Sequence, residues 1–187
     1  MTQCNPLVKA RYLYLDTETT GLHPTEDDLV EVALVDDEGN RILDELCRPA
    51  ESWMRRGWPD AQDIHGIGRG GVAAARPPDA VRRDIAELVR DQDLVIYNAR
   101  FDAPFFLAAG PCELPARTIQ CAMLAAEDFF RWYKWPKLIE AAAWVGHDWR
   151  ATGIPPHRAA GDALASRTVW RYMVANGWRG GPFYDQR

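Results

Sequence analysis

Four carboxylates and one histidine fall into three short clusters spread along the chain. The first cluster is Asp16 and Glu18, the second holds Asp102, and the third combines His157 with Asp162. Carboxylates that lie close together repel one another and resist burial, so a fold that gathers several of them normally does so around hard divalent cations. The three clusters therefore predict a metal-dependent active site.

The first cluster has the spacing of a strand. Residues two apart in a strand point to the same face, so Asp16 and Glu18 can bind one cation from one side. A D-x-E pair is common by chance, and a solvated strand end is the alternative interpretation of this spacing alone. The Thr-Thr-Gly-Leu that follows and the two later clusters favour a metal site.

The other two clusters each have an ordinary alternative. Asp102 follows a short apolar run, where an Asp that caps a helix would look the same. Asp162 falls within the last expected helix, where Asp has poor propensity and needs solvent, a pair or a ligand. His157 follows Pro155-Pro156, and an ordinary surface histidine is the alternative interpretation of it. Because imidazole has an ordinary pKa of about 6.5, it suits a base that takes a proton from water.

The elements that position the first cluster are expected to be strands. Apolar runs over residues 12–16, 29–35 and 42–47 predict an antiparallel meander, and segment 36–40 has the composition of a hairpin loop. After two prolines, apolar residues recur at helical spacing up to residue 89, which predicts an amphipathic helix.

The second and third clusters belong to the remaining half of the chain. Residues 93–97 predict a buried strand, with segment 98–102 at its carboxyl end, where α/β sheets commonly place ligands. Residues 118–121 either form another strand or run into the helical pattern of 123–132. The last two helices are expected over the segments 137–145 and 159–175.

Composition limits the class of protein. With 187 residues and 47% hydrophobic content, one compact domain over residues 1–187 is expected. No stretch approaches the roughly 20 apolar residues of a membrane span, and the N-terminus lacks the blocks of a signal peptide, so a cytoplasmic location is expected. The net charge of -5 argues against binding nucleic acid through a broad basic surface, while a metal site with a local basic rim remains compatible.

The cysteines, the tryptophans and a glycine-rich segment each add an expectation. The four cysteines stand far apart and are expected to be reduced thiols: Cys4, Cys47, Cys112 and Cys121. Tryptophans cluster between Trp132 and Trp149; core packing or a partner surface is favoured over base stacking for them. The glycine-rich segment 49–76 is the least patterned, and we expect it to line or cover the site.

The three clusters, in this order and spacing, resemble the exonuclease motifs of the DEDD superfamily. The third motif carries a histidine, as in the DEDDh branch, which includes the DnaQ-like proofreading exonucleases and RNase T. The resemblance covers residues 12–172 and leaves a short tail, 177–187. It implies an RNase H-like α/β fold with a mixed five-stranded sheet, in which an antiparallel meander joins parallel strands and helices flank both sides.

The resemblance also implies 3′ to 5′ exonuclease activity with two Mg²⁺ or Mn²⁺ ions. By analogy Asp16, Glu18 and Asp162 hold the first ion, and Asp16 bridges to a second that Asp102 binds, partly through water. His157 would deprotonate the attacking water. Two cations about 4 Å apart can stabilise both the entering and the leaving oxygen of an in-line displacement. The expected product is a nucleoside 5′-monophosphate.

The same resemblance implies contacts to the terminal nucleotide, with Leu22 beside its base. The residues concerned are Thr19, Gly21, Leu22, His65, Asn98 and Phe101. An ordinary loop histidine is an equal alternative for His65. Tyr97 stands where the second motif often has histidine, and we expect it to alter packing and leave the chemistry intact.

Substrate and partners are less determined. The Asp-Thr-Glu-Thr-Thr-Gly of the first motif looks more like the DNA-directed members, so single-stranded or frayed DNA 3′ ends are favoured. An RNase T-like or oligoribonuclease-like exoribonuclease is the alternative, because few contacts to the 2′ position separate the sugars. A non-catalytic binding or assembly module would lack a ligand or the base, and all five residues are present. No membrane partner is expected; a polymerase or a second copy as partner stays open, although the short ending lacks a long polymerase-binding tail.

Overall fold

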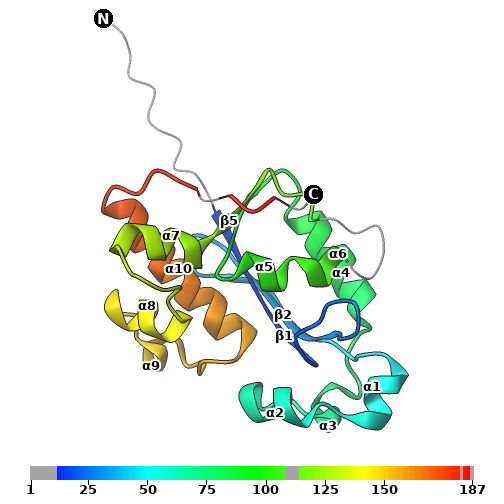
Figure 1. The fold of residues 1–187 in the computed structure, drawn as a ribbon. Helices are drawn as coiled ribbons and strands as arrows, with labels where there is room; N and C mark the ends of the chain where they lie inside the picture. The colour runs from blue at the N-terminus through cyan, green and yellow to red at the C-terminus, as the bar shows by residue number, and fades with distance from the viewer. Residues whose placement is uncertain (1–11, 108–113, 182, 186–187) are drawn as a thin grey trace, which may run out of the picture.

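A five-stranded mixed sheet forms the centre of the computed structural model, which describes residues 12–107, 114–181 and 183–185 (Figure 1). The strand order is β3-β2-β1-β4-β5. The antiparallel meander consists of β1 (Tyr12–Thr19), β2 (Leu29–Val35) and β3 (Arg41–Leu46). On the other side of β1, β4 (Asp93–Ile96) and β5 (Thr118–Cys121) pair in parallel. The predicted α/β fold with this mixed sheet is confirmed.

Helices cover both faces of the sheet, as expected (Figure 1). One face is covered by α4 (Pro78–Leu88), α5 (Ala99–Asp102) and α6 (Pro104–Leu107). The other face is covered by α7 (Ala122–Phe130), α8 (Leu138–Trp144) and α10 (Ala159–Ala175). The short α9 (Trp149–Thr152) lies between α8 and α10 in the chain.

The alternation of β1 divides the hydrophobic core in two. Leu15 packs into the core beneath α4 to α6, whereas Tyr14 packs into the core beneath α7, α8 and α10. Successive strand residues point to opposite faces, so Asp16 and Glu18 share the face of Tyr14, and Thr17 shares the face of Leu15. The core residues that pack on β1 are buried on both of its faces. The strand therefore gives Asp16, Thr17 and Glu18 a rigid support.

Several expected elements have the bounds that the sequence indicates. β2 and α10 agree in full, and α4 and β4 agree within a residue or two. Segment 118–121 is a strand that α7 follows at once, which decides between the two alternatives. β1 continues to Thr19, so Glu18 lies within the strand and not beyond its end.

The segment 49–76 is more regular than its sequence suggests. It contains α1 (Glu51–Arg56), α2 (Pro59–His65) and α3 (Arg69–Val72). These helices are short and separated by glycines, so no helical period builds up in the sequence. They share a small core in which Trp58, Ile67 and Val72 pack with Val30 of β2. This core fixes α2 beside the sheet.

The described cysteines are buried, whereas part of the tryptophan cluster is exposed. Cys47 and Cys121 are buried free thiols, as expected, while Cys4 and Cys112 lie outside the described residues. Trp132 and Trp144 stack on each other at 4.4 Å between ring centroids, and Trp144 is 55% exposed, so part of the tryptophan cluster lies on the surface. Within the described residues, no helix combines the length and apolar character needed to cross a membrane.

Tyr97 makes a buried hydrogen bond whose contribution to stability can be measured. Its hydroxyl is buried and donates a hydrogen bond of 2.9 Å to the carbonyl of Pro136. Tyr97→Phe should lower the free energy of unfolding by about 1–3 kcal/mol, because it leaves that carbonyl without its donor. Urea unfolding measures this difference, with Tyr133→Phe as the control, since Tyr133 is 94% exposed. Equal urea midpoints for Tyr97→Phe and the wild-type protein would contradict a stabilising role for this hydrogen bond.

Candidate active site

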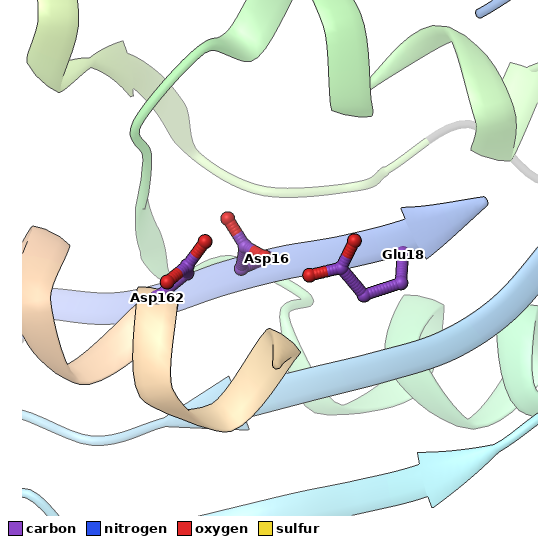
Figure 2. Close-up of side chains that lie close together, drawn as sticks. All are labelled: Asp16, Glu18 and Asp162. Carbon is purple, nitrogen blue, oxygen red and sulfur yellow. The ribbon is translucent and has the colours of Figure 1, made fainter. Parts of the chain in front are cut away.

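Three of the predicted carboxylates meet between β1 and the start of α10. One oxygen from each of Asp16, Glu18 and Asp162 lies within 4.8 Å of the others. Figure 2 shows Asp16 and Glu18 rising from β1 toward Asp162, which projects from the first turn of α10. The strand period and the packing of α10 on this face of the sheet therefore join residues that are more than 140 positions apart.

Asp102 reaches the site from the short helix that follows β4. It is the last residue of α5 and is 4% exposed, and its Oδ1 accepts a hydrogen bond of 2.7 Å from the Thr17 hydroxyl. Asn98 is the residue that begins this helix, so Asp102 is not its N-terminal cap. The charge of Asp102 raises the pKa of Asp16, which places the two carboxylates in one electrostatic site.

Burial raises the pKa values of all four carboxyl groups, and the charges of neighbouring carboxylates add to this effect. The pKa of Asp16 lies well above its ordinary value because of burial first and then the charges of Asp102 and Asp162. Burial raises the pKa of Glu18 to about 9, that of Asp102 to about 7 and that of Asp162 to about 6. The Thr17 hydroxyl opposes the shift at Asp102. These groups therefore keep their protons to higher pH than free carboxyl groups do, and nearby positive charge would favour their ionised forms.

The donor set fits divalent metal ions of the hard type. Every donor is a carboxylate oxygen, which is the ligand that Mg²⁺ and Mn²⁺ prefer. Asp16, Glu18 and Asp162 could share one ion, and Asp102 lies outside that group of three within the described residues. Binding of cations would also relieve the repulsion that raises these pKa values.

His157 stands at the rim of this cluster, two residues before α10 begins. Its side chain is exposed, and its backbone has a left-handed φ of 61°. The backbone N–H of His157 donates a hydrogen bond of 3.2 Å to Oδ1 of Asp162. The predicted base is thus tied by its backbone to a carboxylate of the cluster while its imidazole faces solvent.

Glu31 and Arg158 belong to the site, although the three clusters do not include them. Glu31 lies directly opposite Glu18 in the pairing of β1 with β2 and is 2% exposed. Its carboxylate accepts hydrogen bonds from Arg158 and from the backbone N–H of Ala159. A charged residue in the otherwise apolar run of β2 is the signal that could have found it, since an unpaired charge is almost never buried.

The turn after β1 carries three of the residues expected near a terminal nucleotide. The Thr19 hydroxyl donates a hydrogen bond of 2.5 Å to the carbonyl of Gly21. A Cβ at Gly21 would lie 2.5 Å from the carboxylate of Asp27, so only glycine fits there without a shift. Leu22 is 72% exposed, which leaves an apolar side chain free at the edge of the site.

His65 braces this turn. It is 6% exposed, its Nδ1 accepts the backbone N–H of Ile67 at 3.0 Å, and its Nε2 lies 3.2 Å from the carbonyl oxygen of Thr19. Nε2 therefore carries the proton and donates to Thr19. Burial lowers the pKa of His65, which favours this neutral form. The position of α2 thus places His65 against the end of β1.

The remaining two residues lie on α5. Asn98 is half-buried at its start, where its carbonyl accepts the N–H of Phe101 at 2.8 Å. Phe101 is half-buried and contacts Phe105 with 5.4 Å between ring centroids. Both residues share the short helix that ends at Asp102.

The raised pKa values predict how stability depends on pH without metal. Because the folded protein holds protons that the unfolded chain has lost, the free energy of unfolding should fall as pH rises from about 4 through the folded pKa values near 6, 7 and 9. Asp162→Asn removes one of these groups and should stabilise the metal-free protein at pH 8 by on the order of 1–3 kcal/mol. Urea unfolding in EDTA at pH 5 and pH 8 measures both effects. A wild-type protein that is more stable at pH 8 than at pH 5 would contradict this sign.

Comparison with known proteins relates the site to a family. The RNase_T family, described as exonuclease, matches residues 13–110. The uncharacterized exonuclease CP81 of Escherichia phage 186 is 30% identical over 165 residues, which cover 80% of this chain and 81% of the phage protein. A DNA polymerase III subunit epsilon-like protein of Rhodobacter capsulatus is 36% identical over 107 residues, 54% of this chain and 14% of that protein.

Solved structures share the fold. Exonuclease X in complex with 5′ overhanging duplex DNA superposes with a TM-score of 0.65 at 24% identity, covering 90% of this chain and 94% of that one. E. coli Exonuclease I in complex with a dA16 oligonucleotide gives a TM-score of 0.63 at 22% identity, covering 90% of this chain and 41% of that one. The chain therefore belongs to the exonuclease family, and the resemblance of its motifs to the DEDD 3′–5′ exonucleases is confirmed.

Proposed function

We propose that this exonuclease removes nucleotides from single-stranded or frayed 3′ ends of DNA and releases nucleoside 5′-monophosphates. The observation that carries the proposal is the group of three carboxylates between β1 and α10, with the buried Asp102 bonded to Thr17 of β1 and the exposed His157 at the rim. DNA is favoured because the similar structures of Exonuclease X and Exonuclease I were solved with DNA. A duplex with a 5′ overhang also presents a recessed 3′ end.

Two divalent ions, Mg²⁺ or Mn²⁺, are proposed as cofactors. Asp16, Glu18 and Asp162 would hold one, and Asp16 with Asp102 would hold the other. The ions would supply positive charge beside the scissile phosphate and lower the pKa of water. A zinc-bound form of E. coli Exonuclease I supports a metal site in this fold.

The chain's own residues would divide the remaining work. His157 would accept a proton from water as the water oxygen attacks phosphorus. The bond from phosphorus to the 3′ oxygen breaks, and that oxygen takes a proton from solvent to become the new 3′ hydroxyl of the shortened strand. The turn at Thr19 and Gly21 would hold the terminal nucleotide, with Leu22 against its base. Asn98 and Phe101 would support that pocket from α5, and His65 would keep the carbonyl of Thr19 in place. The solvent-exposed position of Leu22 suits contact with a base that is not paired.

The activity can be tested on matched oligonucleotides of DNA and RNA. Strands labelled at the 5′ end should shorten stepwise with Mg²⁺ or Mn²⁺ and remain intact in EDTA, with DNA cut faster than RNA. A strand labelled at the 3′ terminal nucleotide should release its label as a mononucleotide in the first product. Failure of both strands to shorten with either metal would contradict the activity. Faster cutting of RNA would overturn the choice of DNA and support the exoribonuclease alternative.

Substitutions separate the metal residues from the base. Asp16→Asn should weaken Mn²⁺ binding and abolish turnover, because it removes a charge that both ions need. His157→Ala should leave Mn²⁺ affinity nearly unchanged and lower kcat by about 10²–10⁴-fold. Calorimetry with Mn²⁺ and single-turnover cleavage measure the two properties.

Two residues outside the proposed site serve as matched controls. Asp128 is an exposed carboxylate on α7, and Asp128→Asn should leave both properties unchanged. His147 is half-buried and its ring contacts Thr168, so His147→Ala should keep kcat even if it lowers stability. Wild-type turnover in His157→Ala would remove the proposed base, and wild-type turnover in Asp16→Asn would remove the proposed metal site.

A further inference from the structure

The first turn of α10 is capped by a residue of the sheet. Arg158 occupies the cap position, and its side chain makes no capping hydrogen bond. Helices normally begin at Ser, Thr, Asp or Asn, whose side-chain oxygen accepts a free backbone N–H. Here Oε2 of Glu31, from β2, accepts the N–H of Ala159 at 2.8 Å. A carboxylate also suits the positive end of the helix dipole. This contact fixes the start of α10 on the strand that pairs with β1.

The same carboxylate binds the side chain of Arg158. Nε of Arg158 lies 3.1 Å from each oxygen of Glu31, and the terminal NH2 group also contacts Oε1. The side chain of Glu31 is 2% exposed and that of Arg158 is 41% exposed. Separating the pair would leave the buried charge of Glu31 uncompensated and strongly destabilise the fold. The folded protein therefore keeps the two side chains together. Arg158 and Ala159 are thus both anchored to Glu31.

His157 is fixed from its other side as well. Its N–H donates to Asp162, and its left-handed φ of 61° is a conformation that few residues other than glycine adopt. Gly161 lets the preceding segment lie close to the helix, because a Cβ there would stand 2.6 Å from the carbonyl oxygen of Pro155. The backbone of His157 is therefore constrained on both sides while its imidazole stays exposed.

We propose that Glu31 and Arg158 are positioning residues that hold His157 in register with the carboxylates of β1. This proposal rests on the proposed role of His157 as the base. Glu31 is the cross-strand partner of Glu18, so the pair links the segment that carries His157 to the strand that carries the metal residues. In this role neither Glu31 nor Arg158 would contact the reacting water or the phosphate. If it served only to stabilise α10, its effect on kcat would not depend on His157.

A double-mutant cycle tests this dependence. Arg158→Met and the combined change Glu31→Gln with Arg158→Met are made both with His157 present and with His157→Ala. The combined change removes both charges, so it leaves no unpaired buried carboxylate. With His157 present, each should lower kcat by about 10- to 100-fold and change KM less than about twofold. In the His157→Ala background neither should lower kcat further. Losses that multiply in the two backgrounds would overturn the proposal.

Controls separate this proposal from the proposed function. Arg167→Met removes another arginine of α10, which donates to the carbonyl of Asp37 at 2.7 and 2.9 Å, and it should lower Tm without changing kcat. Arg158→Lys keeps the charge without the two-nitrogen fork and should give an intermediate kcat. In the combined variant, Mn²⁺ affinity should stay within about threefold of wild type, whereas a larger loss would place the effect at the metal residues and overturn the positioning role.

The effect of His157→Ala on kcat distinguishes a failure of the positioning role from a failure of the proposed base. If His157→Ala lowers kcat and the changes at Arg158 do not, the positioning role fails and the base remains. If His157→Ala keeps the wild-type kcat, the base itself fails, and the positioning role fails with it.

Discussion

The repulsion among buried carboxylates is the constraint on which the rest of the structure depends. Asp16, Glu18, Asp102 and Asp162 converge on the middle of the sheet, and their pKa values are all raised. Among the described residues no ion pair neutralises these four, whereas the neighbouring Glu31 is paired with Arg158. A fold can hold such a group only if its scaffold is rigid. The two cores that pack on opposite faces of β1 provide that rigidity.

Much of this arrangement could be predicted from the sequence because it depends on local periods. The strand alternation indicates that Asp16 and Glu18 share a face, and the apolar run before Asn98 indicates the strand that leads to Asp102. The helix of Asp162 has the bounds that its sequence indicates. The resemblance to a known family, based on the order of the three motifs, implied the topology of the whole mixed sheet, which no local period determines.

The rest depends on contacts between distant segments. The bond from His65 to Thr19 requires the small core of α1 to α3, whose short helices have no sequence period. The ion pair of Glu31 with Arg158 joins residues 127 positions apart, so the charge within β2 can mark Glu31 but cannot identify its partner. The hydrogen bond from the hydroxyl of Thr17 to Asp102 likewise joins residues 85 positions apart. These contacts set the geometry of the site, whereas the sequence motifs indicate only its chemistry.

The stoichiometry of Mn²⁺ binding tests the central claim most directly, namely that the four carboxylates form a site for two divalent ions. Calorimetry at pH 8 should find two Mn²⁺ per chain in the wild-type protein. Asp102→Asn should keep one ion, since Asp16, Glu18 and Asp162 remain close together. A wild-type protein that binds no Mn²⁺ or only one, or an Asp102→Asn protein that still binds two, would contradict the account.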